Sequence, residues 1–228
     1  TTIVDTSERA GPTAWPQQHL IGLAPVMRVS RVDSTVYRPA ARLLMVLIVV
    51  GGCVLWPMLR ASQDRPGSPG RDVFRDLLIL LVPALTLVWP QVLLAGWPVP
   101  IVGAVSLLMV GWFSFAGAWL CLLYGRNEWG SGPRLAAAVV PALVTCVLPG
   151  VLWFGGVMSS SPPALEVTPG WMWTPGTAVW ELVRDRSWSG GPVWMGRGHR
   201  AWAWSVCVAG VLCFVLCAVS RRGDGRDA

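Results

Sequence analysis

Ionisable side chains are the residues that could carry chemistry in this chain, and they avoid its long apolar runs. No Asp, Glu, Lys, Arg or His occurs in residues 43–59, 77–124, 135–157 or 201–220. Proton relays, ion-coupled carriers and voltage sensors need such groups at membrane depth, where each costs at least about 2.5–3.5 kcal/mol. The pattern therefore argues against a proton pump or a cation-coupled carrier.

The two histidines, His19 and His199, are the candidates for cofactor ligation, and both lie outside these runs. His199 precedes the last run amid tryptophans, where it could act as an axial ligand of a haem or pigment. We favour a solvated interfacial histidine instead. The sequence contains no metal-ligand spacing, no nucleophile–base arrangement and no phosphate-binding loop. We therefore expect no catalytic residue, no metal site, no cofactor and no enzymatic activity.

The polar side chains inside the runs are hydroxyls and one amide. Gln91 follows Pro90, so its amide can bond to a carbonyl that proline leaves free, or to a neighbouring helix. We favour this structural role over substrate binding. The main hydroxyl side chains inside the runs are those of Thr86, Ser106, Ser114 and Thr145.

Small residues form two faces that favour close helix packing. Such faces let helix backbones approach in lipid, where the hydrophobic effect does not drive association. The contact can be made within the chain or with a partner subunit. The first face comprises Ala104, Gly111, Ser114 and Ala118, and the second comprises Gly210, Cys213 and Cys217.

The composition is that of a membrane protein. Hydrophobic residues make up 54% of the 228 and charged residues 13%, with a mean hydropathy of +0.54. Soluble domains carry about 25% charged residues. The arginines lie beside the apolar runs, where they meet lipid phosphates, so we expect bound lipids. They form no dense stripe with interleaved aromatics, which argues against nucleic-acid binding.

A tight helical hairpin is predicted at the centre of the chain. Residues 77–97 and 101–124 are apolar and are separated by Pro98-Val99-Pro100. Each is longer than the roughly 20 residues that cross a hydrocarbon core of about 30 Å. Because backbone groups in lipid must bond internally, each must be a helix. The prolines cannot continue the first helix, so we expect a turn there.

The fold class predicted is an all-α polytopic membrane protein with about five transmembrane helices. The polar arm before them, residues 1–39, contains a short apolar segment that we interpret as interfacial or docked on a neighbour. A charged tail, residues 221–228, follows them. A sixth crossing requires the last long loop to re-enter the membrane. The predicted spans are 40–59, 77–97, 101–124, 135–157 and 201–220.

The long loop 158–200 is unusually rich in tryptophan. Indole rings favour the headgroup level of a bilayer, so we expect the loop to lie on the lipid surface; a protein interface and a ligand lid are the alternatives. Residues 177–184 could form two helical turns lying flat, with Trp180 and Val183 facing inward. The tryptophans concerned are Trp171, Trp173, Trp180, Trp188 and Trp194.

Orientation and internal symmetry are weakly indicated. Arginines beside the spans divide eight against nine between the two sides, which does not decide the orientation. We expect no cleaved signal peptide, since no apolar core follows a basic segment before residue 40, and this favours a cytoplasmic N-terminus.

Residues 82–90 and 140–149 share a V-P-A-L pattern, which is either a parallel duplication or a chance match.

From these features we expect a non-catalytic structural or accessory subunit of a larger membrane complex, with other membrane proteins and the lipid bilayer as partners. One alternative is the membrane-spanning component of a transporter, powered by a partner or carrying a neutral or lipidic substrate. A second is a pigment- or haem-associated subunit, which rests on His199 and the tryptophans.

Overall fold

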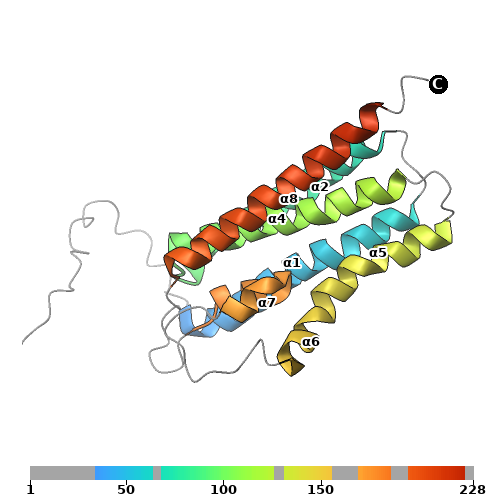
Figure 1. Cartoon of the computed structure of the whole chain (residues 1–228). Helices are drawn as coiled ribbons and strands as arrows, with labels where there is room; N and C mark the ends of the chain where they lie inside the picture. Colours follow the sequence, from blue (N-terminus) through green and yellow to red (C-terminus); the bar gives the residue numbers. More distant parts are fainter. Residues whose placement is uncertain (1–33, 64–67, 126–130, 156–168, 186–194, 224–228) are drawn as a thin grey trace, which may run out of the picture. The chain divides into compact units, whose positions relative to one another are not determined.

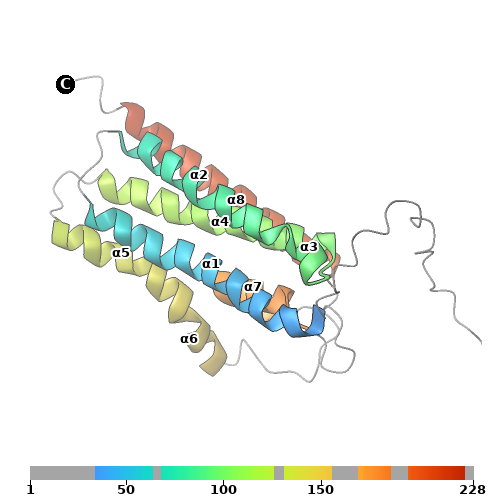
Figure 2. The same ribbon diagram turned by 180° about the vertical axis from the view of Figure 1, so that it is seen from behind.

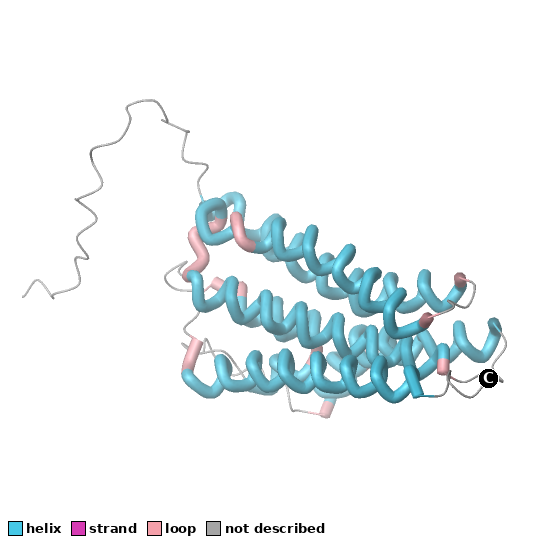
Figure 3. Tube along the Cα trace, turned by 90° about the horizontal axis from the view of Figure 1, so that it is seen from above, coloured by secondary structure: helices cyan, strands magenta, loops and turns pink. Residues whose placement is uncertain are grey.

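The computed structural model describes residues 34–63, 68–125, 131–155, 169–185 and 195–223. Within these ranges the regular elements are helices, and no strand occurs (Figure 3). The predicted arm falls outside them except for its last six residues, as do most of the charged tail and the tryptophans Trp188 and Trp194.

Four helices are long and apolar enough to cross a membrane (Figures 1 and 2). Their apolar parts are Val36–Ser62, Pro69–Leu94, Val99–Tyr124 and Arg197–Ser220. This result confirms the helical class and is compatible with an integral multi-pass membrane protein. The helices are α1 (Ser34–Ser62), α2 (Pro69–Val88, continued by the short α3, Gln91–Leu94), α4 (Val99–Tyr124) and α8 (Arg197–Gly223).

The predicted span 135–157 is interrupted. It consists of α5 (Ser131–Cys146) and α6 (Leu148–Phe154), which meet at a break around Val147. Pro149 lacks the N–H that would bond to the carbonyl of Thr145, so the helix cannot continue unchanged through this point. The 16 residues of α5 reach about 24 Å, less than the roughly 30 Å of a hydrocarbon core. By length, therefore, four helices qualify as spans in the described part rather than five.

The turn of the central hairpin lies slightly earlier than predicted. The chain reverses around Gly96, whose φ of +64° suits glycine because it has no Cβ. Helix α4 then begins at Val99, with Pro100 in its first turn. A helix tolerates proline there, since the first N–H groups have no partner within the helix.

Helix α4 is the central element of the bundle. In its apolar stretch 56% of the residues are buried, against 22–28% in the other three candidate spans. It packs against α1, α2, α5 and α8. Apolar residues occur all round α4, with no polar face, because a helix that is covered on most sides has no side turned to water.

Helices α1 and α4 run in the same direction. Near their starts, Arg38 Nε donates to the Ala95 carbonyl oxygen just before α4, at 2.8 Å. Near their ends, the Tyr124 hydroxyl donates to the Arg60 carbonyl oxygen. Helix α5 returns beside them, and Trp119 Nε1 donates to the Ala137 carbonyl oxygen at 3.0 Å. The loop that follows α5 and α6 must therefore begin at the end where α1 and α4 start.

Helices α4 and α8 touch through their backbones. A Cβ placed on Gly111 would lie 2.7 Å from the Val206 carbonyl oxygen, and one placed on Gly210 would overlap the Gly111 carbonyl group. Both helices start at the same end of the bundle and run side by side (Figures 1 and 2). Glycine is required on both sides of this contact, because any larger residue would push the backbones apart.

Two further glycines accept aromatic rings. The Phe113 ring of α4 lies directly over Gly52 of α1, so close that a Cβ on Gly52 would collide with it. The Phe214 ring of α8 covers Gly117 of α4, where an added Cβ would lie 3.1 Å from Cδ2. Interdigitation of this kind supplies the dispersion contacts that hold helices together in an apolar solvent.

We expect Gly111→Leu to disrupt the bundle. The new side chain would meet the backbone of α8, which cannot move aside without separating the helices, so the loss should be about 3 kcal/mol or more. The measurement is unfolding of the purified chain in mixed micelles with increasing dodecyl sulfate. Gly103→Leu on the same helix is the control, because an added Cβ there meets nothing within 4 Å. Equal stability of the two variants would contradict the contact.

Candidate functional site

The described part of the tryptophan-rich loop packs into the helix bundle. It forms the 3-10 turn η1 (Pro169–Trp173) and the helix α7 (Pro175–Leu182). The apolar residues Ala178, Val179 and Leu182 are fully buried in the same core as α1 and α4. A Cβ on Gly176 would lie 3.3 Å from Val50 Cγ2, in the apolar part of α1. This segment therefore covers part of the candidate span α1. That it lies outside the membrane stays a prediction.

Hydrogen bonds fix the junction between η1 and α7. The Thr177 hydroxyl donates to the Trp171 carbonyl oxygen at 2.7 Å and lies 2.6 Å from the Thr174 hydroxyl. The Trp202 indole of α8 donates to the Met172 carbonyl oxygen at 3.0 Å. The ring of Trp173 packs against the same indole, with 5.1 Å between centroids. The junction is thus tied to α8 as well as to α1.

The prediction that Trp180 faces inward is wrong. Val183 is buried as expected, but 38% of Trp180 is exposed. On a helix, residue 180 lies on the side opposite residues 178 and 182, which form the buried face. The Trp180 ring lies under the Arg42 guanidinium, with 5.2 Å from Cζ to the centroid. The Trp180 indole, on the side of α7 opposite its buried face, therefore makes a cation–π contact with Arg42 of α1.

Arg38, Arg42 and Asp185 form a charged cluster, which we call the Arg–Asp cluster, where α1 starts and α7 ends. Arg42 Nη2 lies 2.8 Å from Asp185 Oδ2, and Arg38 Nη1 lies 3.3 Å from Asp185 Oδ1. Arg42 Nε also donates to the Val183 carbonyl oxygen at 3.1 Å. The arginine side chains are only 11% and 15% exposed, so the nearby carboxylate stabilises their charges.

The Arg–Asp cluster joins three segments that are distant in sequence. Arg38 bonds to Ala95 before α4 as well as to Asp185 after α7. Nearby, the buried Glu181 forms an ion pair with Arg184 at 2.9 Å. Neither pairing was predicted from the sequence, in which the arginines beside the apolar runs suggested lipid phosphates as their partners. One signal was available: two of the chain's twelve acidic residues lie within five positions in this apolar loop.

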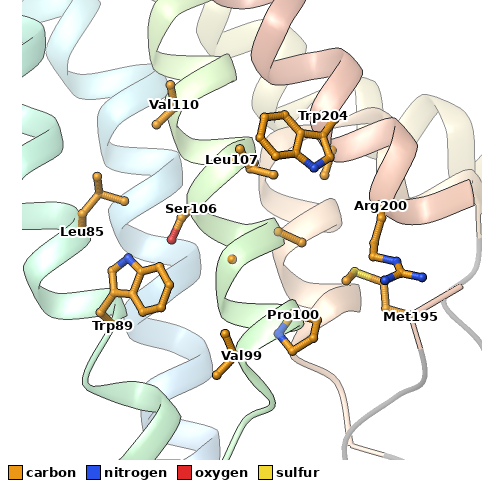
Figure 4. A pocket seen from close by; sticks show the side chains of 13 residues that line it. Leu85, Trp89, Val99, Pro100, Ser106, Leu107, Val110, Met195, Arg200 and Trp204 are labelled. Carbon is orange, nitrogen blue, oxygen red and sulfur yellow. The ribbon is translucent and has the colours of Figure 1, made fainter. Parts of the chain in front are cut away.

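An apolar groove of about 460 Å³ lies between α2, α4 and α8 (Figure 4). Its lining begins at Val99, where α4 begins, with Trp89 nearby; Arg200 is in the first turn of α8, and Trp204 lies farther along, beside Leu107. Ser106 supplies a hydroxyl, which donates to the Val102 carbonyl oxygen of its own helix. The remaining lining residues are Leu85, Val99, Pro100, Gly103, Ala104, Leu107, Val110, Met195 and Ala203.

The small residues predicted to pack have different positions. Ala104, Gly111, Ser114 and Ala118 are all buried on α4, and Gly111 contacts Gly210 of α8. On α8, Cys217 is half-buried but Cys213 is exposed. Phe214, which lies closer in angle to Gly210, takes the inward position instead. The second predicted face therefore packs through Gly210 without Cys213.

His199 lies in the first turns of α8, outside the lining of the groove. Its Nδ1 atom is buried and has no hydrogen-bond partner among the described residues. In the same part of the chain, no three His, Cys, Asp or Glu side chains gather in a way that could hold a metal ion. No observation connects His199 to a pigment or haem.

We expect Asp185→Asn to destabilise the chain by about 1–3 kcal/mol, because two largely buried guanidinium groups lose their counter-charge. The measurement is the midpoint of thermal unfolding in a non-ionic detergent. Asp72→Asn is the control: Asp72 lies in the first turn of α2 and should contribute only about 0.5 kcal/mol through the helix dipole. If both variants lose the same stability, the Arg–Asp cluster does not hold the segments together.

Neither a protein-family model, nor a curated protein, nor a solved structure matches the chain.

Proposed function

We propose that this chain is a non-catalytic integral membrane subunit that assembles with other membrane proteins. The proposal rests on one observation: polar side chains in the apolar helices donate hydrogen bonds to carbonyl oxygens of the same chain segment, three or four residues earlier. Gln91 Nε2 donates to the Leu87 carbonyl oxygen at 3.1 Å, and Thr86 Oγ1 donates to Pro83 at 2.8 Å. Ser106 and Ser205 bond in the same way to carbonyls four residues earlier.

These bonds occupy side-chain donors that a substrate could otherwise use, whereas Gln91 Oε1 is buried without a hydrogen-bond partner among the described residues. A hydroxyl that donates to its own helix is satisfied without a ligand and costs little in lipid. The charged groups at the start of α1 and the end of α7 are likewise paired within the chain, in the Arg–Asp cluster. What such a chain offers to its surroundings is therefore mainly apolar surface.

Helix α6 is the surface that we assign to a partner. It packs on α5 and makes no comparable contact with another described helix. Its side chains are apolar, and Phe154 is 91% exposed. With seven residues α6 is too short to span a membrane on its own. A short apolar helix that bends away from the bundle is better covered by a neighbouring protein than by the lipid of a regular span.

Photo-crosslinking tests this assignment in native membranes. We expect benzoylphenylalanine in place of Phe154 to form an adduct with one discrete polypeptide after irradiation. The control position is Leu216, which is 68% exposed on α8 and should contact only lipid. Mass spectrometry then identifies the partner, and mild detergent should yield a stoichiometric complex. A chain that behaves as a 24.6 kDa monomer and gives only lipid adducts from position 154 would contradict the proposal.

The groove favours a second candidate, the membrane component of a transporter for a neutral or lipidic substrate. Its walls are apolar and it opens between helices rather than into a sealed core. Transbilayer movement of a fluorescent lipid in proteoliposomes separates the two candidates. Movement that depends on the purified chain would favour the transporter, whereas none is expected for a subunit that only assembles.

A further inference from the structure

We propose that the groove between α2, α4 and α8 holds one anionic phospholipid from the surrounding bilayer, with its phosphate at Arg200 and an acyl chain along α4. This inference goes beyond the proposed function, because a subunit could assemble with partners without such a site. It rests on the length, the walls and the charge of the groove.

The groove has the length of one bilayer leaflet. Its lining extends along α4 from its first residue, Val99, to Val110. This stretch of helix rises about 16 Å, or about half of the roughly 30 Å of a hydrocarbon core. The volume of about 460 Å³ is within the range of roughly 300–1,000 Å³ that small-molecule sites occupy. An acyl chain that enters at the headgroup level would therefore end near the middle of the membrane.

The walls suit an alkyl chain. Leu85 of α2 lines the groove on one side of α4, and Leu107 of α4 lines it beside Trp204 of α8; Met195 lies near Arg200 on the same side. Ser106 is already bonded within its helix, so it requires no polar ligand. An alkyl chain breaks no hydrogen bond on entering such walls, whereas a polar ligand would lose its own.

The end of the groove near the starts of α4 and α8 suits a phosphate. Arg200 is exposed there, and in the described part it has no carboxylate partner, in contrast to Arg38 and Arg42. Helices α4 and α8 both begin at this end, so their positive dipole ends add to its charge. The indole of Trp89 lies beside Val99 at this end (Figure 4), and tryptophans favour the headgroup level. A guanidinium binds phosphate through two parallel hydrogen bonds.

Native mass spectrometry of the full chain in mild detergent, titrated with dioleoyl phosphatidylglycerol, tests the headgroup contact. We expect one saturable lipid that binds more tightly than dioleoyl phosphatidylcholine. Arg200→Gln should weaken phosphatidylglycerol binding about tenfold, because it removes one charge-assisted contact. Arg197→Gln is the control, since Arg197 is exposed one turn earlier on α8 but does not line the groove.

A groove-filling variant tests the acyl contact. Gly103 lines the groove and an added Cβ there meets nothing within 4 Å, so Gly103→Leu should fold normally and exclude the lipid. Gly51→Leu is the control, because Gly51 is equally open but lies on α1 outside the groove. Unchanged phosphatidylglycerol binding in either Arg200→Gln or Gly103→Leu would overturn the proposal. So would phosphatidylcholine binding as tight as that of phosphatidylglycerol.

Discussion

The backbone contact between Gly111 and Gly210 is the constraint on which the rest of the bundle depends. Apolar side chains gain nothing by leaving lipid for a protein core, so helices in a membrane associate through close packing. Glycine on both sides brings the backbones of α4 and α8 into direct contact, with no room for a Cβ on either. Because both helices start at one end, the chain must return to that end before α8 begins. That return places η1 and α7 beside the start of α1.

The same contact explains why a groove exists. Helix α8 is held on α4 at Gly111, and near its far end Ala218 contacts α2, where a Cβ on Gly70 would lie 3.2 Å from Ala218 Cβ. Toward the other end α2 and α8 no longer meet, and Gly103 and Ala104 form the floor between them. Small residues on α4 thus allow the helices to touch at one level and leave a space at another.

The sequence predicts the apolar helices and the small-residue face of α4, because both follow from periodicity along one segment. It does not predict which helix meets that face, since several runs carry glycine, and so the pairing of Gly52 with the Phe113 ring was not foreseen. The Arg–Asp cluster is harder to predict from the sequence, because Asp185 is 143 residues from Arg42 along the chain. The break between α5 and α6 could be suspected from Pro141 and Pro149, but its extent depends on what packs beside it.

The docking of α7 determines which charged side chains at this end of the bundle are paired within the chain and which face its surroundings. By covering α1, α7 removes water from Arg38 and Arg42, and the same segment brings Asp185, whose carboxylate stabilises their charges there. Glu181, buried on α7, is stabilised by Arg184 in the same way. The acidic side chains described in this loop are therefore paired with arginines, Asp185 with Arg38 and Arg42 of α1 and Glu181 with Arg184 of the loop itself. Arg200, on α8 and outside that cover, keeps its charge toward the surroundings, where phosphate is the abundant counter-ion in a bilayer.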